Sequence, residues 1–256
     1  MNMDIEKIET LAQYIEYVDK LPLEFSLSRG QTIDKPLLPS GMRTDESGNR
    51  IYSKTQLEQI VIKFKSNSYQ YIRNTGDVNN NYEWLVYAQH FGIPTRLLDF
   101  TFSPLTSLLF ALENTFQFND ISDDAVVWFL NPVELNKLSA SRTEIINISE
   151  NKDIDLNTKE LPVVIASKMI NHRVDAQKGC FVYFQNDSLA LEQNCNSDTY
   201  LRKVIIPANK RKSILVSLYK IGYRFINLYP ELDSIAKDVK LEINVIDYLK
   251  GLDAND

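Results

Sequence analysis

The sequence predicts an α+β fold in a single domain, with a central mixed and antiparallel sheet flanked by helices. Strand-like and helix-like segments both occur, but without the steady strand–helix–strand repeat of a doubly wound fold. The chain of 256 residues is long for one core and short for two, and no repeat or linker divides it. Hydrophobic residues make up 44% and charged residues 24%, which is typical of globular proteins.

The N-terminal part of the chain predicts a helix, a strand and a long loop. Apolar residues recur at helical spacing over residues 4–20, and Pro22 ends this helix. Residues 25–28 alternate like a strand that runs into Arg29. Residues 31–52 are rich in turn-forming residues, and a loop of this length inside a domain is usually mobile or functional.

The middle part of the chain predicts three helices and two strands. Helices are expected over 55–73, 82–91 and 104–117, and a Ser-Pro pair suits the start of the last one. Strands are expected over 95–100 and 125–130. The second strand is a continuous apolar run, which indicates burial on both faces.

The C-terminal half predicts a surface excursion followed by more regular structure. Asn131 and the proline after it begin one further helical turn, and the polar, acidic residues 140–160 are expected on the surface. Three more strands are expected at 163–166, 180–184 and 201–206. Two helices at 209–220 and 230–250 are expected to close the chain.

Charge and composition limit the classes of function. The net charge of -6 and a pI near 5.1 favour a cytoplasmic protein and argue against coating nucleic acid through bulk charge, although a local basic cleft stays compatible with them. Two cysteines do not make a disulfide scaffold. The acidic N-terminus does not resemble a signal peptide, and no stretch reaches the roughly 20 apolar residues that cross a bilayer. We therefore expect no membrane contact.

Several common catalytic and metal-binding patterns are missing from the sequence. It contains no GxGxxG, GxxxxGK[ST], HExxH or GxSxG motif. His172 has no metal-ligand partner at a useful spacing. The sequence therefore predicts no metal site.

The first group of candidate residues is Arg29 and Gly30 at the predicted strand end. The guanidinium group of arginine offers a fixed fork of donors to a phosphate or carboxylate, and glycine lets the backbone turn sharply. A strand-terminal arginine that pairs with an acidic neighbour is the competing, structural interpretation. Local sequence favours the structural one.

The second group lies in residues 88–105, where a helix, a strand and a second helix follow closely. His90 is placed at a helix C-terminus, where the helix dipole favours its protonated form. Arg96 and Asp99 are three apart in an extended run and should project to opposite faces, so one of them is expected to be structural. The simplest role for Asp99 is to accept backbone amides of the turn at 101–103.

The third group lies in residues 171–181. Gln177 and Gly179 flank the entry to a predicted strand. Gln177 either caps a turn or presents its amide at the edge of a pocket, and spacing alone does not separate these two interpretations.

Taken together, these stretches resemble the FRG domain, a family named for a Phe-Arg-Gly motif. Ser28-Arg29-Gly30 keeps the Arg-Gly core of that motif, with serine in the aromatic position. Further segments that match the family pattern lie at 35–43, 89–104, 173–181 and 228–233. The candidate residues Arg43 and Arg173 come from two of these segments.

The resemblance implies a division of the chain and a biological setting. It implies an N-terminal helix at 1–22, an FRG domain at 23–240, and a helix end with a tail at 241–256. The family is bacterial and phage-associated, which implies a role in toxin or phage-defence biology and the presence of an inhibitory partner protein.

The order of the motifs is also similar to that in ADP-ribosyltransferases, which implies an ADP-ribosyltransferase-like fold and NAD as a substrate. This similarity assigns cofactor contacts to Arg29, Gly30, Thr101 and Ser103, and catalytic roles to His90 and Gln177. The chain departs from the pattern at Gly179, where a carboxylate would be expected. Either Glu192 or Asp175 supplies that carboxylate, or the site binds without turnover.

Three functions therefore stay open at this point. The first is an NAD-consuming transferase in a toxin or defence setting. The second is a non-catalytic module that binds a nucleotide or nucleic acid through Arg29, Arg43, Arg96 and Arg173 on one face. The third is a scaffold subunit in which the polar motifs only stabilise turns. Whether the protein is an enzyme is left open.

Overall fold

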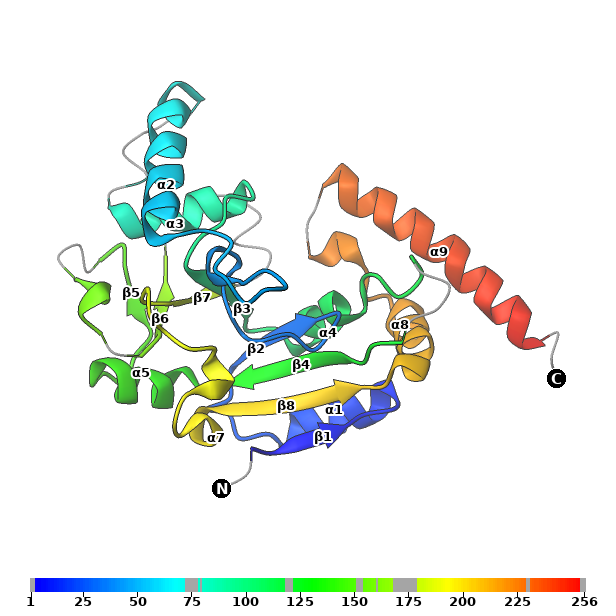
Figure 1. Ribbon diagram of the computed structural model, residues 1–256. Helices are drawn as coiled ribbons and strands as arrows, with labels where there is room; N and C mark the ends of the chain where they lie inside the picture. The colour runs from blue at the N-terminus through cyan, green and yellow to red at the C-terminus, as the bar shows by residue number, and fades with distance from the viewer. Residues whose placement is uncertain are drawn as a thin grey trace.

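The computed structural model describes residues 3–71, 78, 80–117, 122–150, 154–159, 161–167, 179–228 and 231–253. These residues form one sheet with helices on both sides (Figure 1). The predictions at Arg173, Asp175 and Gln177 lie outside the described residues.

The sheet has eight strands in the order β1-β8-β4-β2-β3-β7-β6-β5. Their bounds are β1 (Ile5–Lys7), β2 (Leu27–Gln31), β3 (Leu97–Thr101), β4 (Ala125–Leu130), β5 (Ile146–Asn147), β6 (Val163–Ala166), β7 (Gly179–Tyr183) and β8 (Leu201–Ile206). The two edge strands pair in parallel, β1 with β8 and β5 with β6, and the other pairs are antiparallel. The predicted α+β fold with a mixed sheet is confirmed.

The α-helices that the structure describes surround this sheet. Their bounds are α1 (Leu11–Lys20), α2 (Lys54–Ser68), α3 (Asn81–His90), α4 (Pro104–Leu112), α5 (Pro132–Ala140), α7 (Ser197–Tyr200), α8 (Arg211–Lys220) and α9 (Leu232–Asp253). Short 3-10 turns are found at Ser40–Met42, Tyr69–Tyr71, Leu156–Thr158, Leu191–Gln193, Ala208–Lys210 and Phe225–Asn227. Among the helices so described, none combines the length and apolar character needed to span a membrane.

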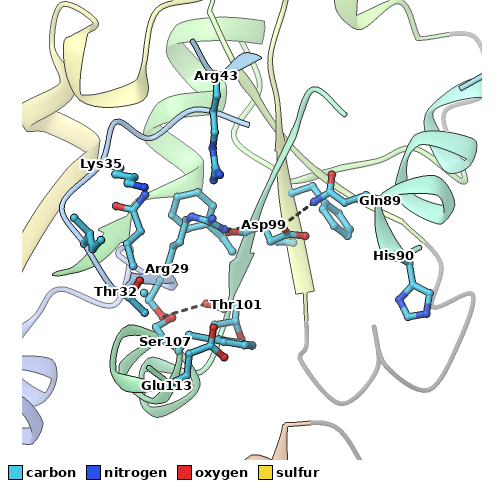
Figure 2. Close-up of a pocket in the computed structure, with 18 of the residues that line it drawn as sticks. Arg29, Thr32, Lys35, Arg43, Gln89, His90, Asp99, Thr101, Ser107 and Glu113 are labelled. Atoms are coloured by element: carbon cyan, nitrogen blue, oxygen red, sulfur yellow. Dashed lines mark hydrogen bonds and ion pairs between the residues drawn. The ribbon is translucent and has the colours of Figure 1, made fainter. Parts of the chain in front are cut away.

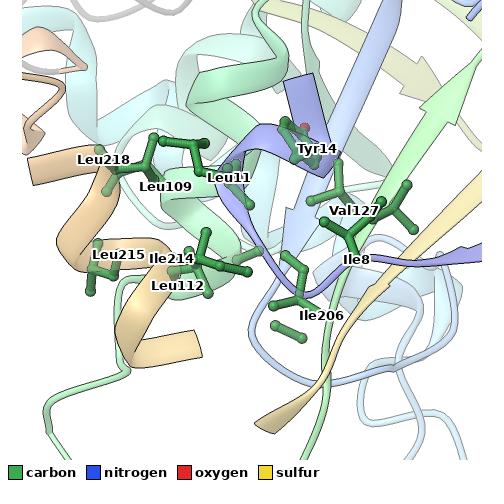
Figure 3. Packing of buried hydrophobic residues seen from close by; sticks show 14 of the residues in the cluster. Ile8, Leu11, Tyr14, Leu109, Leu112, Val127, Ile206, Ile214, Leu215 and Leu218 are labelled. Carbon is green, nitrogen blue, oxygen red and sulfur yellow. The ribbon is translucent and has the colours of Figure 1, made fainter. Parts of the chain in front are cut away.

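The main apolar core lies between the helices α1, α4 and α8 and the half-sheet β1-β8-β4-β2. Figure 3 shows Leu109 of α4, Leu218 of α8, Tyr14 of α1 and Val127 of β4 in one cluster of buried side chains. All four side chains are at most 1% exposed. The burial of these apolar side chains stabilises the half-sheet that carries β2.

The sheet is nearly divided between β2 and β3. These strands share a single paired position, Ser28 with Thr101, whereas β2 pairs with β4 along its whole length and β3 pairs with β7 along its whole length. Beyond Ser28 the two strands diverge, and the half-sheets β1-β8-β4-β2 and β3-β7-β6-β5 separate. Several of the candidate residues discussed below lie at this fork.

The sequence placed several boundaries incorrectly. Residues 5–7 form β1, and the helix expected from residue 4 starts only at Leu11, after Thr10 and Gln13 form a capping box. The strand expected at 25–28 is β2, so Arg29 lies within the strand and does not follow it. A strand of three residues has too few positions to show a period, which is why β1 was taken for helix.

Two segments expected to be irregular are anchored in the structure. The excursion at 140–160 contains β5, and Ile146, Ile148 and Leu156 there are at most 1% exposed. Helix α5 before it has nine residues, more than the single turn expected. The loop at 31–52 is anchored by Leu37 and Met42, which are buried in a second apolar cluster with side chains of β3, β4 and β7.

Candidate functional site

A pocket of about 530 Å³ opens at the fork between β2 and β3. Figure 2 shows side chains from both strands, from α3 and α4, and from the loop after β2 around this hollow. Its polar lining includes the predicted residues Arg29, Gly30, Arg43, His90, Asp99 and Thr101. The structure therefore brings together most of the candidates that lie in the described part of the chain.

Arg29 bridges the fork at the base of the pocket. Its Nη1 donates to the backbone carbonyl of Asp99 at 2.8 Å and lies 3.9 Å from Asp99 Oδ2. This contact replaces the backbone pairing that β2 and β3 lose where they diverge. Its Nε is buried without a hydrogen-bond partner among the described residues, and the side chain is 19% exposed.

Three effects act on the pKa of Arg29. Desolvation lowers the pKa, the negative charge of Asp99 raises it, and the positive charge of Arg43 lowers it. The guanidinium group stays charged at neutral pH.

Gly30 has a packing role that differs from the turn expected from the sequence. It lies within β2, and a Cβ added there would lie 1.9 Å from the carbonyl oxygen of Ser107 and 2.7 Å from the amide nitrogen of Ala111. Only glycine therefore allows α4 to pack directly on β2. Ser28, on the same face of the strand, accepts a hydrogen bond from Ser107 Oγ at 2.8 Å.

Two further cations reach the pocket from the loop after β2. In Figure 2, Arg43 points toward Arg29 from one side and Lys35 lies on another. The segment around Arg43 is fixed because the amide of Gly41 donates to the carbonyl of Thr95 at 3.0 Å. A Cβ on Gly41 would lie 2.7 Å from that same carbonyl oxygen. The long loop therefore delivers charged side chains to the site from an anchored backbone.

Asp99 is the carboxylate nearest to Arg29, and its role differs from the one expected. The amide of Ser103 donates to Thr101 Oγ1 at 3.1 Å, so Thr101 accepts the turn amide that was assigned to Asp99. Asp99 instead accepts from Gln89 Nε2 at 2.7 Å, and Gln89 Oε1 accepts a short hydrogen bond from Thr95.

The carboxylate of Asp99 lies inside the pocket. The surrounding protein desolvates it and raises its pKa, while Arg29 and Gln89 act in the opposite direction. Its side chain is nevertheless 54% exposed, because the pocket itself leaves it accessible. Asp99 is therefore a partly charge-compensated carboxylate that a ligand can reach.

His90 lines the same pocket but does not meet Arg29. It is the last residue of α3, and its ring packs edge-on against Phe91 with centroids 5.0 Å apart. In Figure 2 it lies on the far side of Asp99 from Arg29, with its ring turned away from the guanidinium group. Gln177 lies outside the described residues, so the structure does not describe the expected meeting of Arg29, His90 and Gln177.

Other predicted residues lie elsewhere. Ser103 caps α4, accepting from the amide of Thr106 at 3.3 Å, and it does not line the pocket. Arg96 lines a different hollow, as its spacing from Asp99 predicted. Glu192, considered as a substitute carboxylate, accepts from the amide of Leu37 at 3.2 Å and also lies outside the pocket lining.

Sequence reasoning missed several residues of the pocket. Gln89, Lys35 and Glu113 contribute polar groups, and Phe110 and Phe181 add an aromatic wall. Gln89 and Lys35 lie inside segments that were singled out, but nothing in their spacing marked them as facing the site. Cys180 also lines the pocket, and burial raises the pKa of its thiol to about 12, which makes it a poor nucleophile.

The chemistry of the site follows from its charges. Arg29, Arg43 and Lys35 supply cationic donors, while Asp99 and Glu113 are the carboxylates of the lining. Such an arrangement suits a phosphate-bearing ligand and places one carboxylate beside it. Within the described residues, no group of three His, Cys, Asp or Glu side chains is placed to bind a metal ion.

Comparison with known proteins identifies the segment that builds this pocket. The family model for the FRG domain matches residues 26–120. Neither a search of curated proteins nor a search of solved structures found a match to the chain. The matched range includes β2, α2, α3, β3 and α4, and thus every pocket residue named here except Cys180 and Phe181. Over residues 26–120 this chain is therefore similar to the FRG domain.

Proposed function

We propose that the pocket binds a nucleotide through its phosphate groups, with the guanidinium group of Arg29 as the central contact. The observation that carries this proposal is a charged, mostly buried guanidinium group at the base of an accessible pocket, whose one hydrogen bond among the described residues runs from Nη1 to a backbone carbonyl. A buried charge is costly unless it is compensated, and a phosphate oxygen compensates it with charge-assisted hydrogen bonds.

The electrostatics around Arg29 support an anionic ligand. Arg43 faces the same hollow and lowers the pKa of Arg29, because two like charges disfavour each other. An anion between the two guanidinium groups would relieve that repulsion. The carboxylates of Asp99 and Glu113 offset only part of the positive charge, because three cationic side chains, Arg29, Arg43 and Lys35, line the pocket.

The shape of the pocket supports a nucleotide over inorganic phosphate. Its volume of about 530 Å³ lies within the range of pockets for small organic ligands. Phe110 and Phe181 also line the pocket, and each offers a ring against which a base could lie. One pocket therefore offers groups for both the charged and the aromatic parts of the ligand.

We further propose that the nucleotide is NAD and that Asp99 is the catalytic carboxylate. In such a reaction the bond between the ribose C1′ and the nicotinamide nitrogen breaks, and nicotinamide leaves as a neutral molecule with the bonding electron pair. The positive charge that develops on the ribose is stabilised by a nearby carboxylate. An acceptor hydroxyl or amine then forms the new bond to C1′ and releases its proton.

The specific support for this chemistry is the position of Asp99. It gives the site the carboxylate that the sequence lacks at Gly179, and it is accessible within the pocket. Non-catalytic nucleotide binding is the second candidate, favoured because Gln89 and Arg29 already engage this carboxylate. Binding through four arginines on one face receives no support, because Arg96 lines a different hollow.

Calorimetric titration tests the binding proposal. NAD, ADP-ribose, ADP and inorganic phosphate are titrated into the wild type and into Arg29→Gln. We expect the variant to weaken nucleotide binding about 10- to 100-fold, the range for loss of a charge-assisted hydrogen bond. Arg142→Gln is the matched control, because Arg142 pairs with Glu144 at the surface, outside the pocket. Equal affinity in wild type and Arg29→Gln would refute the proposal.

Nicotinamide release tests the chemistry separately. Wild type and Asp99→Asn are incubated with NAD, and free nicotinamide is measured over time. Asparagine keeps the shape of the side chain but removes its charge, so release should fall while NAD binding persists. Binding without release from the wild type, with candidate acceptors supplied, would leave the non-catalytic function as the correct one.

A toxin or phage-defence role is the cellular form of this proposal. If NAD consumption harms the host, expression of the wild type should slow bacterial growth, and Arg29→Gln should restore it. A protein that binds and silences the toxin would be the expected partner. Unchanged growth with wild-type protein that consumes NAD in vitro would contradict the cellular role alone.

A further inference from the structure

A second hollow lies beside the N-terminal half of α3, and its volume is about 880 Å³. It is bounded by α2, by α3 and by the segment around the 3-10 turn Leu156–Thr158. The two ends of α3 line different hollows, since Gln89 and His90 at its C-terminus line the pocket while Tyr82 and Trp84 near its N-terminus line this groove. We call it the aromatic groove.

The aromatic groove contains ring platforms held in fixed positions. The hydroxyl of Tyr82 accepts from the amide of Leu156 at 2.8 Å, and its ring packs edge-on against Tyr183 at 5.3 Å between centroids. Tyr69 packs against Trp84 with centroids 5.5 Å apart and is itself 47% exposed. A planar ligand can therefore meet an aromatic surface that is ordered before it binds.

Cations lie beside these rings. The guanidinium carbon of Arg96 is 4.9 Å from the centre of the Tyr183 ring, and Lys65 Nζ is 5.4 Å from that of Trp84. Among the described residues, the guanidinium group of Arg96 makes one hydrogen bond, from Nη1 to Asn157 Oδ1 at 3.2 Å. Most of the five N–H donors of this guanidinium group are thus left for a ligand.

The charge of the groove is locally positive in a protein of net charge -6. Three cationic side chains line it, Lys54, Lys65 and Arg96, against the carboxylates of Glu58 and Asp155. A small positive excess suits a few phosphates, whereas an extended nucleic-acid track would need a longer basic surface.

We propose that the aromatic groove binds one or two unpaired nucleotides of a single-stranded nucleic acid. Bases stack on Tyr69 and Tyr82, and the adjacent phosphates contact Arg96 and Lys65. Aromatic platforms beside cations are the physical requirement for such binding, because every base has a face that stacks and every linkage carries a charge. Asn81 and Asn186 line the groove and offer amide groups to base edges.

This site does not depend on the function proposed for the pocket. The two hollows do share a connection, because Thr95 lines the groove and donates to Gln89 Oε1, which lines the pocket. The proposal rests on the groove alone, and occupancy of each hollow can be measured separately.

The two tryptophans of the chain provide that separation. Trp84 lines the groove, whereas the indole nitrogen of Trp128 donates to Gln31 Oε1 at 3.2 Å beside the pocket. Trp128→Phe therefore leaves a reporter at the groove, and Trp84→Phe leaves one at the pocket. A short single-stranded RNA and a short single-stranded DNA, both of mixed sequence, are the probes, titrated into the full chain.

We expect the probes to change the fluorescence of Trp128→Phe and to leave that of Trp84→Phe unchanged. In the Trp128→Phe background, Tyr69→Ala should weaken binding about 10-fold, as loss of a stacking platform does. Arg96→Gln should weaken binding and reduce the slope of log affinity against log salt by about one. Tyr71→Ala is the matched control, because Tyr71 lies in the same turn, is 79% exposed and does not line the groove.

Three results would overturn the proposal. The first is no fluorescence change in Trp128→Phe while circular dichroism shows the native fold. The second is a response confined to Trp84→Phe, which would place binding at the pocket. The third is an equal loss of affinity in Tyr69→Ala and Tyr71→Ala.

Discussion

Arg29 and Gly30 are neighbours in β2, yet they serve two different regions of the molecule. Gly30 faces α4 and the apolar core, where a single added carbon would collide with the helix backbone. Arg29 faces the fork, where the sheet opens and a charged group remains accessible. The Arg-Gly pair therefore joins a packing requirement to a charged group of the pocket lining in two consecutive residues.

The difference between the regions shows how a sheet can carry a polar site without losing stability. The half-sheet β1-β8-β4-β2 is closed by backbone pairing and by the apolar cluster under α1, α4 and α8. At the fork, one residue pair and the side chain of Arg29 connect β2 to β3. Stability comes mainly from the first region, so the second can leave charged groups incompletely paired.

The largest effect is expected at Gly30. Gly30→Ala places a Cβ 1.9 Å from the carbonyl oxygen of Ser107, and neither the strand nor α4 can shift without disturbing the core. We expect a loss of unfolding free energy of about 3 kcal/mol or more, or no soluble protein. Urea unfolding followed by circular dichroism measures this. Gly251→Ala in α9, where nothing lies within 4 Å of the added carbon, should be neutral or slightly stabilising.

A change at Arg29, the residue before Gly30, should affect stability little and nucleotide binding strongly. Arg29→Met removes one hydrogen bond to the Asp99 carbonyl and a partly desolvated charge, and these contributions offset each other. We expect the unfolding free energy to change by less than about 1 kcal/mol, while nucleotide affinity is lost. A destabilisation as large as that of Gly30→Ala would show that the fork, too, is a structural element and would remove the contrast between the two regions.

The sequence predicts the framework better than it predicts the fork, and particular residues show why. Asn80 caps α3 by accepting from the amides of Tyr82 and Glu83, and Ser103 and Pro104 begin α4, so these helices follow from local patterns. The buried strand β4 follows from its apolar run. Each of these signals lies within a few residues of the structure that it specifies.

The fork depends on contacts between residues far apart in the chain. Arg29 meets the carbonyl of Asp99 across 70 positions, and no local period encodes where β2 and β3 separate. The sequence singled out both residues but assigned Asp99 to a turn that Thr101 serves. It also could not show that Gln89, one helix away, would orient the carboxylate. Side-chain networks of this kind are specified by the tertiary fold and not by spacing.

Gln89 allows a test of how strongly the polar network supports the fork. Gln89→Leu removes the donor to Asp99 Oδ2 and the acceptor for Thr95, leaving both groups without that partner. We expect a loss of about 1–2 kcal/mol in unfolding free energy, intermediate between the two changes above. Gln193→Leu, at an exposed position outside the pocket lining, is the control. No difference between the two variants would mean that the network orients Asp99 without stabilising the fold.

The smallest expected effect is a pH dependence that belongs to the fork alone. Desolvation raises the pKa of Asp99 above its usual value, so its carboxyl group takes up a proton at a higher pH than an exposed aspartate does. As the pH falls through that raised pKa, the pocket loses one negative charge and gains net positive charge. The affinity for an anionic nucleotide should therefore rise on acidification, by less than the full effect of one charge because the side chain of Asp99 is 54% exposed.

The control is Asp99→Asn, whose side chain carries no charge at any pH. Dissociation constants are measured by calorimetry at several pH values, and the ratio of the wild-type constant to the variant constant isolates the contribution of Asp99. A ratio that stays constant from neutral to acidic pH would show that the charge of Asp99 does not affect the bound anion. The proposed place of the phosphates beside Arg29 would then be wrong.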